Sequence, residues 1–374
     1  MPTKIIYKSY FKYIIPLILI IFVFLTSGSP LNFIFNNEMN VSAWTAITIK
    51  SQNLFSNLNQ FGDESHIAKT VFRLTIPLLV KFFKISFLQI VLLQFIISYY
   101  MFYMLFEIFK NRMNLEVALI LITFISSVYF GKALLIDFRW FDGWAFFFFV
   151  LALYTKYQLI VFFSILLGLF TDERFIFMLP VLFVFLGNFD YERFSIYSMT
   201  SKRNFVVIFS FLSYFLIRLY LSFFYEMQQP TDAIGYEALI ANIDKRLLGM
   251  GVFTFFEGMW LIPIYLFVFL RNQLVKEKFL FFVFLYLFFS CCLMFLVYDV
   301  SRSGAYLIPI LILIIDIAFR KLPSDSFLIL LKSGCIISLF FPNYYVMNGI
   351  AMNNFNLNEY LNILFRKISI YLEN

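Results

Sequence analysis

The chain has 374 residues, of which 62% are hydrophobic and only 14% are charged, and its mean hydropathy is +0.86. This composition supplies too little polar surface to cover a soluble globule of that size, so a soluble fold is excluded. The apolar residues form unbroken blocks and do not alternate with polar ones, which indicates membrane helices and excludes a β-barrel. The net charge of +7 comes from dispersed Lys and Arg, which suits loops that face anionic lipid and does not indicate a nucleic-acid partner.

Apolar blocks that approach the length of a bilayer span, about 20 residues, recur along the whole chain. We expect an all-α membrane bundle of eleven transmembrane helices, with ten to twelve allowed, in one integral-membrane domain over residues 1–374. The expected ranges are 10–26, 85–109, 114–131, 142–155, 157–171, 174–188, 204–224, 252–270, 279–298, 304–319 and 326–341. The three ranges between residues 142 and 188 are short, so each could instead be a partial span or a re-entrant hairpin.

Basic residues set the expected orientation. Lys4, Lys8 and Lys12 precede the first helix, so the positive-inside rule puts the N-terminus in the cytoplasm. The first helix lacks an A-x-A-like cleavage site and is expected to remain as an uncleaved anchor. Alternation then places two long loops, at about 27–70 and 226–251, on the outer face. An amphipathic tail is expected at about 343–374.

Directly after the first outer loop, the stretch VFRLTIPLLVKFFK (71–84) combines basic and apolar residues. This pattern is typical of an amphipathic helix that lies in the membrane interface. The stretch is followed directly by the second expected span. A short helix along the membrane surface is therefore predicted at the end of the loop.

Acidic and basic residues stand together at four helix ends, all of them on the expected outer face. The four clusters are DESHIAKTVFR (63–73), DFRWFDG (137–143), TDER (171–174) and YDVSRSG (298–304). A charge in hydrocarbon costs roughly 2.5 to 3.5 kcal/mol, so these residues must lie at a surface or in a wet cavity. Any one cluster could be an ordinary charged helix end. Four clusters on one face indicate a polar cavity that suits an anionic substrate.

Two local geometries are expected within the clusters. Asp299 and Arg302 are about one turn apart if helical, so they are placed to form a pair. Asp137 and Asp142 bracket a turn, and Gly143 would allow the chain to bend sharply into the next helix. For each arginine, the alternative is a structural ion pair that holds two helices together.

Several kinds of chemistry are excluded or left open by residue type. His66 is the only histidine, so a His-based metal cage or a multi-His relay is excluded. Cys291, Cys292 and Cys335 fall inside expected helices and are predicted to be free buried thiols. The sequence has no Walker A motif and no G-x-G-x-x-G motif, so a nucleotide-driven pump is not indicated. No cofactor is predicted, although a divalent metal held by carboxylates alone stays open.

The long outer loop with its carboxylates and the Asp/Arg pairs at outer helix ends resemble the integral-membrane glycosyltransferases of the GT-C type, which broadly include bacterial O-antigen polymerases and ligases. The strings HIAKTVFRLTIPLL, FDGWAFFF, TDER and DVSRS resemble membrane proteins of bacterial surface-polysaccharide loci. The chain departs from the family in lacking an acidic pair directly after the first helix and a dominant loop in its second half. The resemblance implies a GT-C-like bundle in the bacterial inner membrane.

The resemblance also implies an activity. Such enzymes transfer a sugar from a polyprenyl phosphate or diphosphate carrier to an acceptor hydroxyl at the outer face of the membrane. The implied partners are a polyprenyl-linked saccharide, membrane lipid and other polysaccharide-assembly proteins. Arginines would hold the phosphate and a carboxylate would act as general base. The candidates are Arg73, Arg139, Arg174 and Arg302 for the phosphate; Asp172, Glu173, Asp63 and Glu64 for the base; and His66, Asp137, Asp142 and Asp299 as supporting residues.

Two other classes of protein stay open. A transporter or flippase for a lipid-linked or anionic substrate would line a cavity with the same charges, and it would show an internal inverted repeat or paired broken helices near the bilayer midplane. No such repeat is visible in the sequence. A non-catalytic scaffold would tolerate the loss of the four charged clusters.

Overall fold

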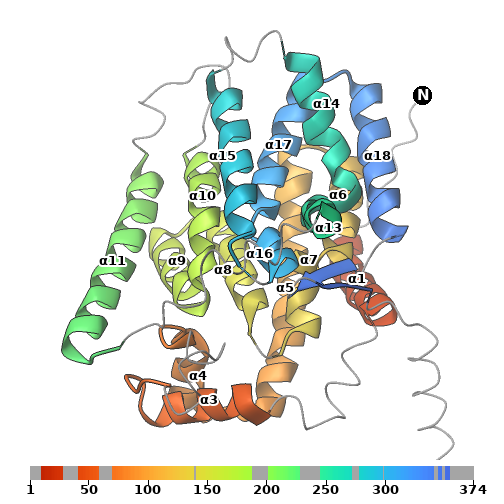
Figure 1. Cartoon of the computed structure of the whole chain (residues 1–374). Coiled ribbons are helices and arrows are strands. Elements are labelled where there is room, and N and C mark those ends of the chain that lie inside the picture. The colour runs from red at the N-terminus through yellow and green to blue at the C-terminus, as the bar shows by residue number, and fades with distance from the viewer. Residues whose placement is uncertain are drawn as a thin grey trace, which may run out of the picture.

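The computed structural model describes residues 10–27, 41–58, 70–138, 140–187, 201–227, 245–271, 278–297, 299–340, 344–347 and 350–353. These residues form a bundle that is helical almost throughout (Figure 1). The first half contains α1 (Phe11–Ser27), α3 (Val41–Gln52), α4 (Thr75–Phe83), α5 (Phe87–Arg112), α6 (Leu115–Ser127), α7 (Tyr129–Ile136), α8 (Asp142–Tyr154), α9 (Gln158–Thr171), the 3-10 helix η4 (Glu173–Met178) and α10 (Leu179–Leu186). The second half contains α11 (Lys202–Phe224), α13 (Lys245–Phe256), η6 (Glu257–Trp260), α14 (Leu261–Leu270), α15 (Lys278–Met294), α16 (Val300–Ala305), α17 (Ile308–Lys321) and α18 (Ser324–Phe340).

Helices occur in all the expected ranges, but only some are long enough to cross a membrane. Among the described residues, α5, α11 and the segment Leu248–Leu270 are long and apolar enough by themselves. The pair α6 and α7, which is bent by 54°, makes a fourth candidate if it is counted as one span. A helical protein with candidate membrane spans is therefore confirmed, whereas eleven full spans are not.

The charged clusters explain why several helices are short. Helix α7 ends before Asp137, α8 begins at Asp142, α9 ends before Asp172 and α16 begins after Asp299. Two of these aspartates cap the helix that follows. The Asp172 carboxylate accepts a bond of 2.9 Å from the Arg174 backbone N–H, and Asp299 accepts one of 3.3 Å from the Arg302 backbone N–H. Such caps favour a new helix start and interrupt the preceding apolar run.

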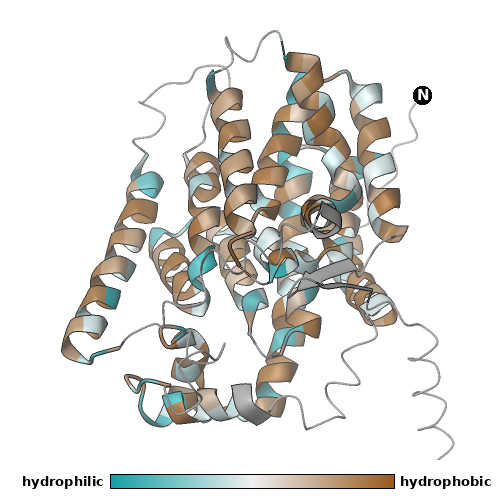
Figure 2. Cartoon of the chain, in the orientation of Figure 1, coloured by the Kyte–Doolittle hydropathy of each residue, from teal (hydrophilic) through white to brown (hydrophobic). Residues whose placement is uncertain are grey.

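The helices at the outside of the bundle consist largely of apolar residues, which are brown in Figure 2. Helix α11 stands at one edge of the bundle and exposes Phe209 (63%), Leu216 (64%) and Phe223 (81%). Helix α17 lies inside, and its residues from Ile308 to Ala318 are all buried. Large exposed apolar faces around a packed centre are expected when lipid, and not water, surrounds the helices.

Two short helices, α3 within the first outer loop and α4 directly after it, lie at one end of the bundle (Figure 1). Helix α4 matches the amphipathic helix expected at 71–84, and its Phe82 and Phe83 are 72% and 70% exposed. Its start is fixed to the end of α9, because the Leu74 N–H donates to the Phe170 carbonyl at 2.8 Å and the Thr75 hydroxyl donates to the Leu167 carbonyl at 2.8 Å. Helix α3 was not predicted.

The C-terminal segment differs from the expected amphipathic tail. Residues Tyr344–Met347 (β1) and Ile350–Asn353 (β2) pair as an antiparallel hairpin. The rest of the expected tail lies outside the described residues. The three cysteines are free thiols, as predicted, but only Cys335 is buried: Cys291 is half-buried and Cys292 is exposed.

Candidate functional site

Segments from all four charged clusters meet at one place in the bundle. We call this group of charged side chains the Arg/Asp cluster; its members are Arg73, Asp137, Asp142, Asp172, Glu173, Arg174, Asp299 and Arg302. They come from the start of α4, the α7–α8 turn, the α9–η4 junction and the start of α16. The sequence places these segments up to about two hundred residues apart, so the contact is a product of the fold.

Asp142 lies at the centre of the Arg/Asp cluster and is fully buried at the first turn of α8. Its Oδ2 accepts bonds from Nε and Nη2 of Arg302 at 2.9 and 2.7 Å. Nη2 of Arg174 donates to the same oxygen at 3.2 Å, and Nη1 of Arg73 lies 3.9 Å from Oδ1. One carboxylate therefore connects the arginines of three separate segments.

Asp172 forms the second centre of the cluster. Nε and Nη2 of Arg174 donate to its Oδ1 and Oδ2 at 2.9 and 2.7 Å, and Nη2 of Arg73 lies 2.7 Å from Oδ2. Burial would raise the pKa of the Asp172 carboxyl, but the guanidinium groups of Arg174 and Arg73 hold it well below its usual range. Arg174 also donates to the Ser303 hydroxyl at 2.9 Å, which ties η4 to α16.

Asp299 and Asp137 are the two remaining aspartates of the Arg/Asp cluster. Nη1 of Arg302 lies 3.0 Å from Oδ2 of Asp299, which confirms the pair expected from their spacing. Asp137 accepts a hydrogen bond of 2.6 Å from the Tyr129 hydroxyl and one of 3.0 Å from the backbone N–H of Trp140. These bonds close the turn between α7 and α8.

Gly143 has a different role from the one expected. The turn is made by Phe141, whose φ of 61° is left-handed. A Cβ at Gly143 would lie 2.5 Å from the backbone N of Leu134 in α7. The glycine therefore allows α8 to approach α7 closely, and the sharp bend occurs two residues earlier.

The described members of the cluster are three arginines and five carboxylates, so the cluster does not carry a net positive charge. Arg174 and Arg302 donate chiefly to Asp172, Asp142 and Asp299, and the geometry gives them the role of holding those carboxylates. Arg73 is different: within the described part of the chain, its Nε and Nη1 have no hydrogen-bond partner. Among the arginines of the cluster, Arg73 is therefore the one with side-chain donors that form no hydrogen bond with the described residues.

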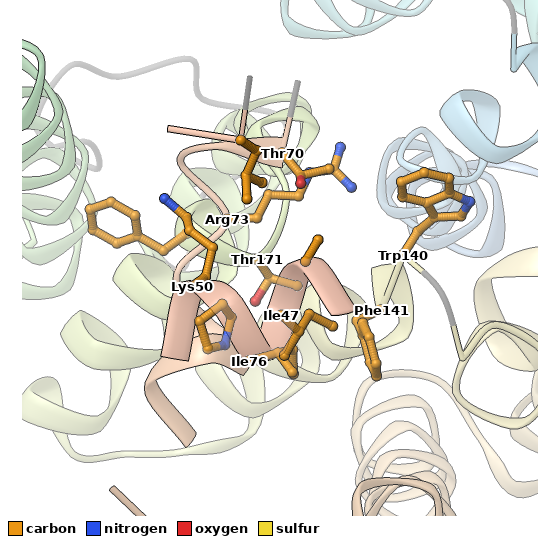
Figure 3. A pocket seen from close by; sticks show the side chains of 12 residues that line it. Ile47, Lys50, Thr70, Arg73, Ile76, Trp140, Phe141 and Thr171 are labelled. Atoms are coloured by element: carbon orange, nitrogen blue, oxygen red, sulfur yellow. The ribbon is translucent and has the colours of Figure 1, made fainter. Parts of the chain in front are cut away.

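A pocket opens beside Arg73, between α3, α4 and the ends of α7 and α9 (Figure 3). In the close view, Arg73 lies between Lys50 on one side and Trp140 on the other. Polar groups are contributed by Lys50, Thr70, Arg73 and Thr171, and apolar walls by Ile47, Ile76 and Phe141. This is a basic pocket with an aromatic side, which we call the Lys50–Arg73 pocket.

Lys50 is a site residue that the sequence analysis missed. It is only 2% exposed, and its Nζ donates to the Leu54 carbonyl at 3.1 Å and to the Ser56 carbonyl at 3.0 Å. None of the described carboxylates forms an ion pair with it. Burial lowers the pKa of the Lys50 ammonium to about 7, so its charge changes near neutral pH.

The predicted base candidates differ in access. Asp172 has both oxygens engaged by arginines and no exposed surface. The Glu173 side chain is 36% exposed and its Oε1 lies 3.5 Å from Nη2 of Arg73. Glu173 is thus the accessible carboxylate next to the pocket. The candidates Asp63, Glu64, His66 and Arg139 lie outside the described residues.

The fold and the site together define a helical protein with candidate membrane spans and a buried Arg/Asp cluster beside a basic pocket. Comparisons of the chain with protein-family models, with curated proteins and with solved structures find no match. The function is therefore argued from the site itself.

Proposed function

We propose that the protein is a membrane glycosyltransferase or polymerase of surface-polysaccharide assembly that uses a polyprenyl-linked sugar phosphate as donor. The observation that carries the proposal is Arg73, whose Nε and Nη1 lack partners among the described residues and whose side chain lines a pocket together with Lys50. A phosphate is the group that this arrangement suits, because guanidinium and ammonium donors both bind its oxygens strongly.

The pocket also suits the other parts of such a donor. Trp140 lines the pocket with an aromatic ring of the kind on which a sugar ring can pack, and the Arg302 guanidinium lies over that ring, 5.4 Å from its centroid; Thr70 and Thr171 also line the pocket. Ile76 and Pro77 of α4 form an apolar wall, and the same helix exposes Phe82 and Phe83. A prenyl chain would follow this apolar helix from the pocket into the lipid.

In the proposed reaction, Glu173 accepts the proton of the acceptor hydroxyl as that oxygen bonds to the sugar C1. The bond between C1 and the carrier phosphate oxygen breaks, and its electron pair leaves with the phosphate. Arg73 and Lys50 stabilise the negative charge that grows there. Arg174 and Arg302 hold Asp172 and Asp142 in fixed positions. Asp172 orients Arg73 through Nη2, whereas Nε and Nη1 of Arg73 form no hydrogen bond with the described residues.

A transporter or flippase is the second candidate, and a specific observation favours it. The break between α6 and α7 is followed within one turn by the buried Lys132, and the break between α13 and α14 carries the buried Glu257. Lys132 and Glu257 interact electrostatically, and Oε2 of Glu257 lacks a hydrogen-bond partner within the described residues. Broken helices with ionisable residues are the feature expected of transporters.

Binding of polyprenyl phosphate to the full chain in nanodiscs tests the enzyme proposal at the pocket. The decisive variant is Arg73→Lys, because lysine keeps a positive charge beside Asp172 but loses the planar set of donors. We expect Arg73→Lys to weaken binding at least about tenfold, the size of one charge-assisted hydrogen bond. Lys81→Ala removes an exposed cation of α4 that does not line the pocket, and it is the control for a general loss of positive charge near the pocket.

A transport assay distinguishes the two candidates. Vesicles that contain the protein and a lipid-linked sugar, but no acceptor, should show no protein-dependent movement of the donor between leaflets. The transporter proposal would replace the enzyme proposal if the donor moves between leaflets, if Lys132→Met or Glu257→Gln abolishes this movement, and if Arg73→Lys has no effect on it.

A further inference from the structure

A second polar cavity lies at the opposite ends of the helices that carry the Arg/Asp cluster. Helix α8 begins at Asp142 in the cluster and ends in this cavity at Tyr154, and α9 runs in the opposite direction from Tyr157 in the cavity towards Asp172. The cavity extends over about 1940 Å³ including its open mouth. It is therefore distinct from the Lys50–Arg73 pocket and is separated from it by the length of α8.

Three cations line this cavity, and they come from three different elements. Arg112 ends α5, Lys156 lies in the turn between α8 and α9, and Arg203 begins α11. The lining carboxylate is Asp316 of α17, and it is shared, because both Arg112 at 3.4 Å and Arg320 at 3.3 Å bind it. The lining is thus positive on balance.

Two of the three cations are available to a ligand. Within the described ranges, neither Lys156 nor Arg203 forms an ion pair; Arg203 donates only to the Lys156 carbonyl, at 3.1 Å. The Lys156 side chain is exposed and that of Arg203 is half-buried. Arg112 is fixed by three contacts, to Asp316, to the Phe185 carbonyl and to the Phe185 ring. Among the described residues, the cavity is therefore lined by one arginine held by fixed contacts and by two cations without an ion pair.

The mouth of the cavity adjoins exposed apolar surfaces. On α9, Leu159 is 67% exposed, and Phe205 at the start of α11 is 60% exposed. These two helices pack on each other through Phe162 and Phe209, whose ring centroids are 5.5 Å apart. Tyr157, which is 73% exposed at the rim, has the amphipathic ring that favours the headgroup level of a bilayer.

We infer that this cavity binds the phosphate group of an anionic phospholipid headgroup. Clustered Arg and Lys supply its charge complement, and the apolar helix faces at the mouth accommodate the acyl chains. The inference rests on residues that the proposed glycosyl transfer does not use, so either can fail alone.

Native mass spectrometry of the full chain released from nanodiscs tests the inference. The nanodiscs contain phosphatidylcholine with one fifth phosphatidylglycerol or cardiolipin, and the retained lipids are counted. The test variant is Lys156→Glu with Arg203→Glu. The control is Lys202→Glu with Arg271→Glu, which makes the same change in charge at exposed residues outside the cavity.

We expect the unmodified chain and the control to retain one anionic lipid preferentially, and the test variant to retain it at least about tenfold less, given about 1 kcal/mol for each basic residue. Soluble inorganic phosphate provides a second arm in detergent. If phosphate or glycerol phosphate alone stabilises the unmodified chain as well as the lipid does, the site is one for a free phosphate and the lipid assignment is overturned. Equal lipid retention by the test and control variants would overturn the site itself.

Discussion

Replacing Asp142 with Asn tests whether the Arg/Asp cluster holds the helices together. Asp142 is fully buried and contacts Arg302 at 2.7 Å, Arg174 at 3.2 Å and Arg73 at 3.9 Å. Asparagine keeps the size and one acceptor oxygen but removes the charge that these three arginines share. Removing one partner of a buried ion pair costs about 3–5 kcal/mol, because the other charge is left uncompensated. Since Arg302 and Arg174 keep Asp299 and Asp172, we expect about 3 kcal/mol.

The free cysteines provide the assay. Cys335 is buried, whereas Cys291 is half-buried and Cys292 is exposed. A thiol-reactive dye that enters the lipid or detergent therefore labels Cys335 last, when the bundle opens. The midpoint of the slow labelling step on heating should fall by at least about 5 °C in Asp142→Asn. Asp325→Asn, at an exposed position of α18, should leave the midpoint unchanged.

A double variant separates charge pairing from a simple packing defect. Asp142→Asn combined with Arg302→Gln should be more stable than the sum of the two single effects by at least about 1 kcal/mol, since the two groups are in direct contact. Additive effects, or an Asp142→Asn midpoint equal to that of the unmodified chain, would refute the view that the cluster is a stabilising network.

Three further predictions concern the pocket and its support. Because the pKa of Lys50 is about 7, Lys50 is mostly charged at pH 6 and mostly neutral at pH 8. A lipid phosphodiester does not titrate in this range, so its binding should weaken as pH rises. The binding isotherms of Lys50→Met should not change with pH. Glu173→Gln should lower glycosyl transfer by roughly 10²–10⁴-fold with donor binding unchanged, and a turnover assay at saturating donor that finds full activity would exclude it as the base. Gly143→Ala should destabilise the bundle by about 1–3 kcal/mol in the thiol-labelling assay, because its Cβ would lie 2.5 Å from the Leu134 backbone.

Sequence alone could predict where the helices lie, because long apolar blocks are a strong local signal. It could not predict how many of them span the membrane. The 54° bend between α6 and α7 is a break within one candidate span, and its angle depends on how the two helices pack in the folded bundle. The hairpin at 344–353 did have a local signal, since Asn348 and Gly349 separate its two strands in the sequence.

The members of the Arg/Asp cluster could also be recognised from sequence, because acid and base together at an apolar helix end are unusual. The role of each residue within the cluster could not be predicted from sequence. Whether an arginine is occupied by a carboxylate or free for a ligand depends on contacts such as Arg302 with Asp142, which are 160 residues apart. Lys50 was missed because a single lysine in a polar loop carries no signal until α3 buries it against α4.

The most direct test of the central claim is the surface polysaccharide of the host after deletion of the gene. Electrophoresis should show loss of the polysaccharide ladder or a shortened repeat unit. Complementation with the unmodified gene or with Lys81→Ala should restore the normal profile, whereas Arg73→Lys and Glu173→Gln should not, although both proteins reach the membrane in normal amounts. An unchanged profile after deletion, or full restoration by both pocket variants, would contradict glycosyl transfer at the Lys50–Arg73 pocket.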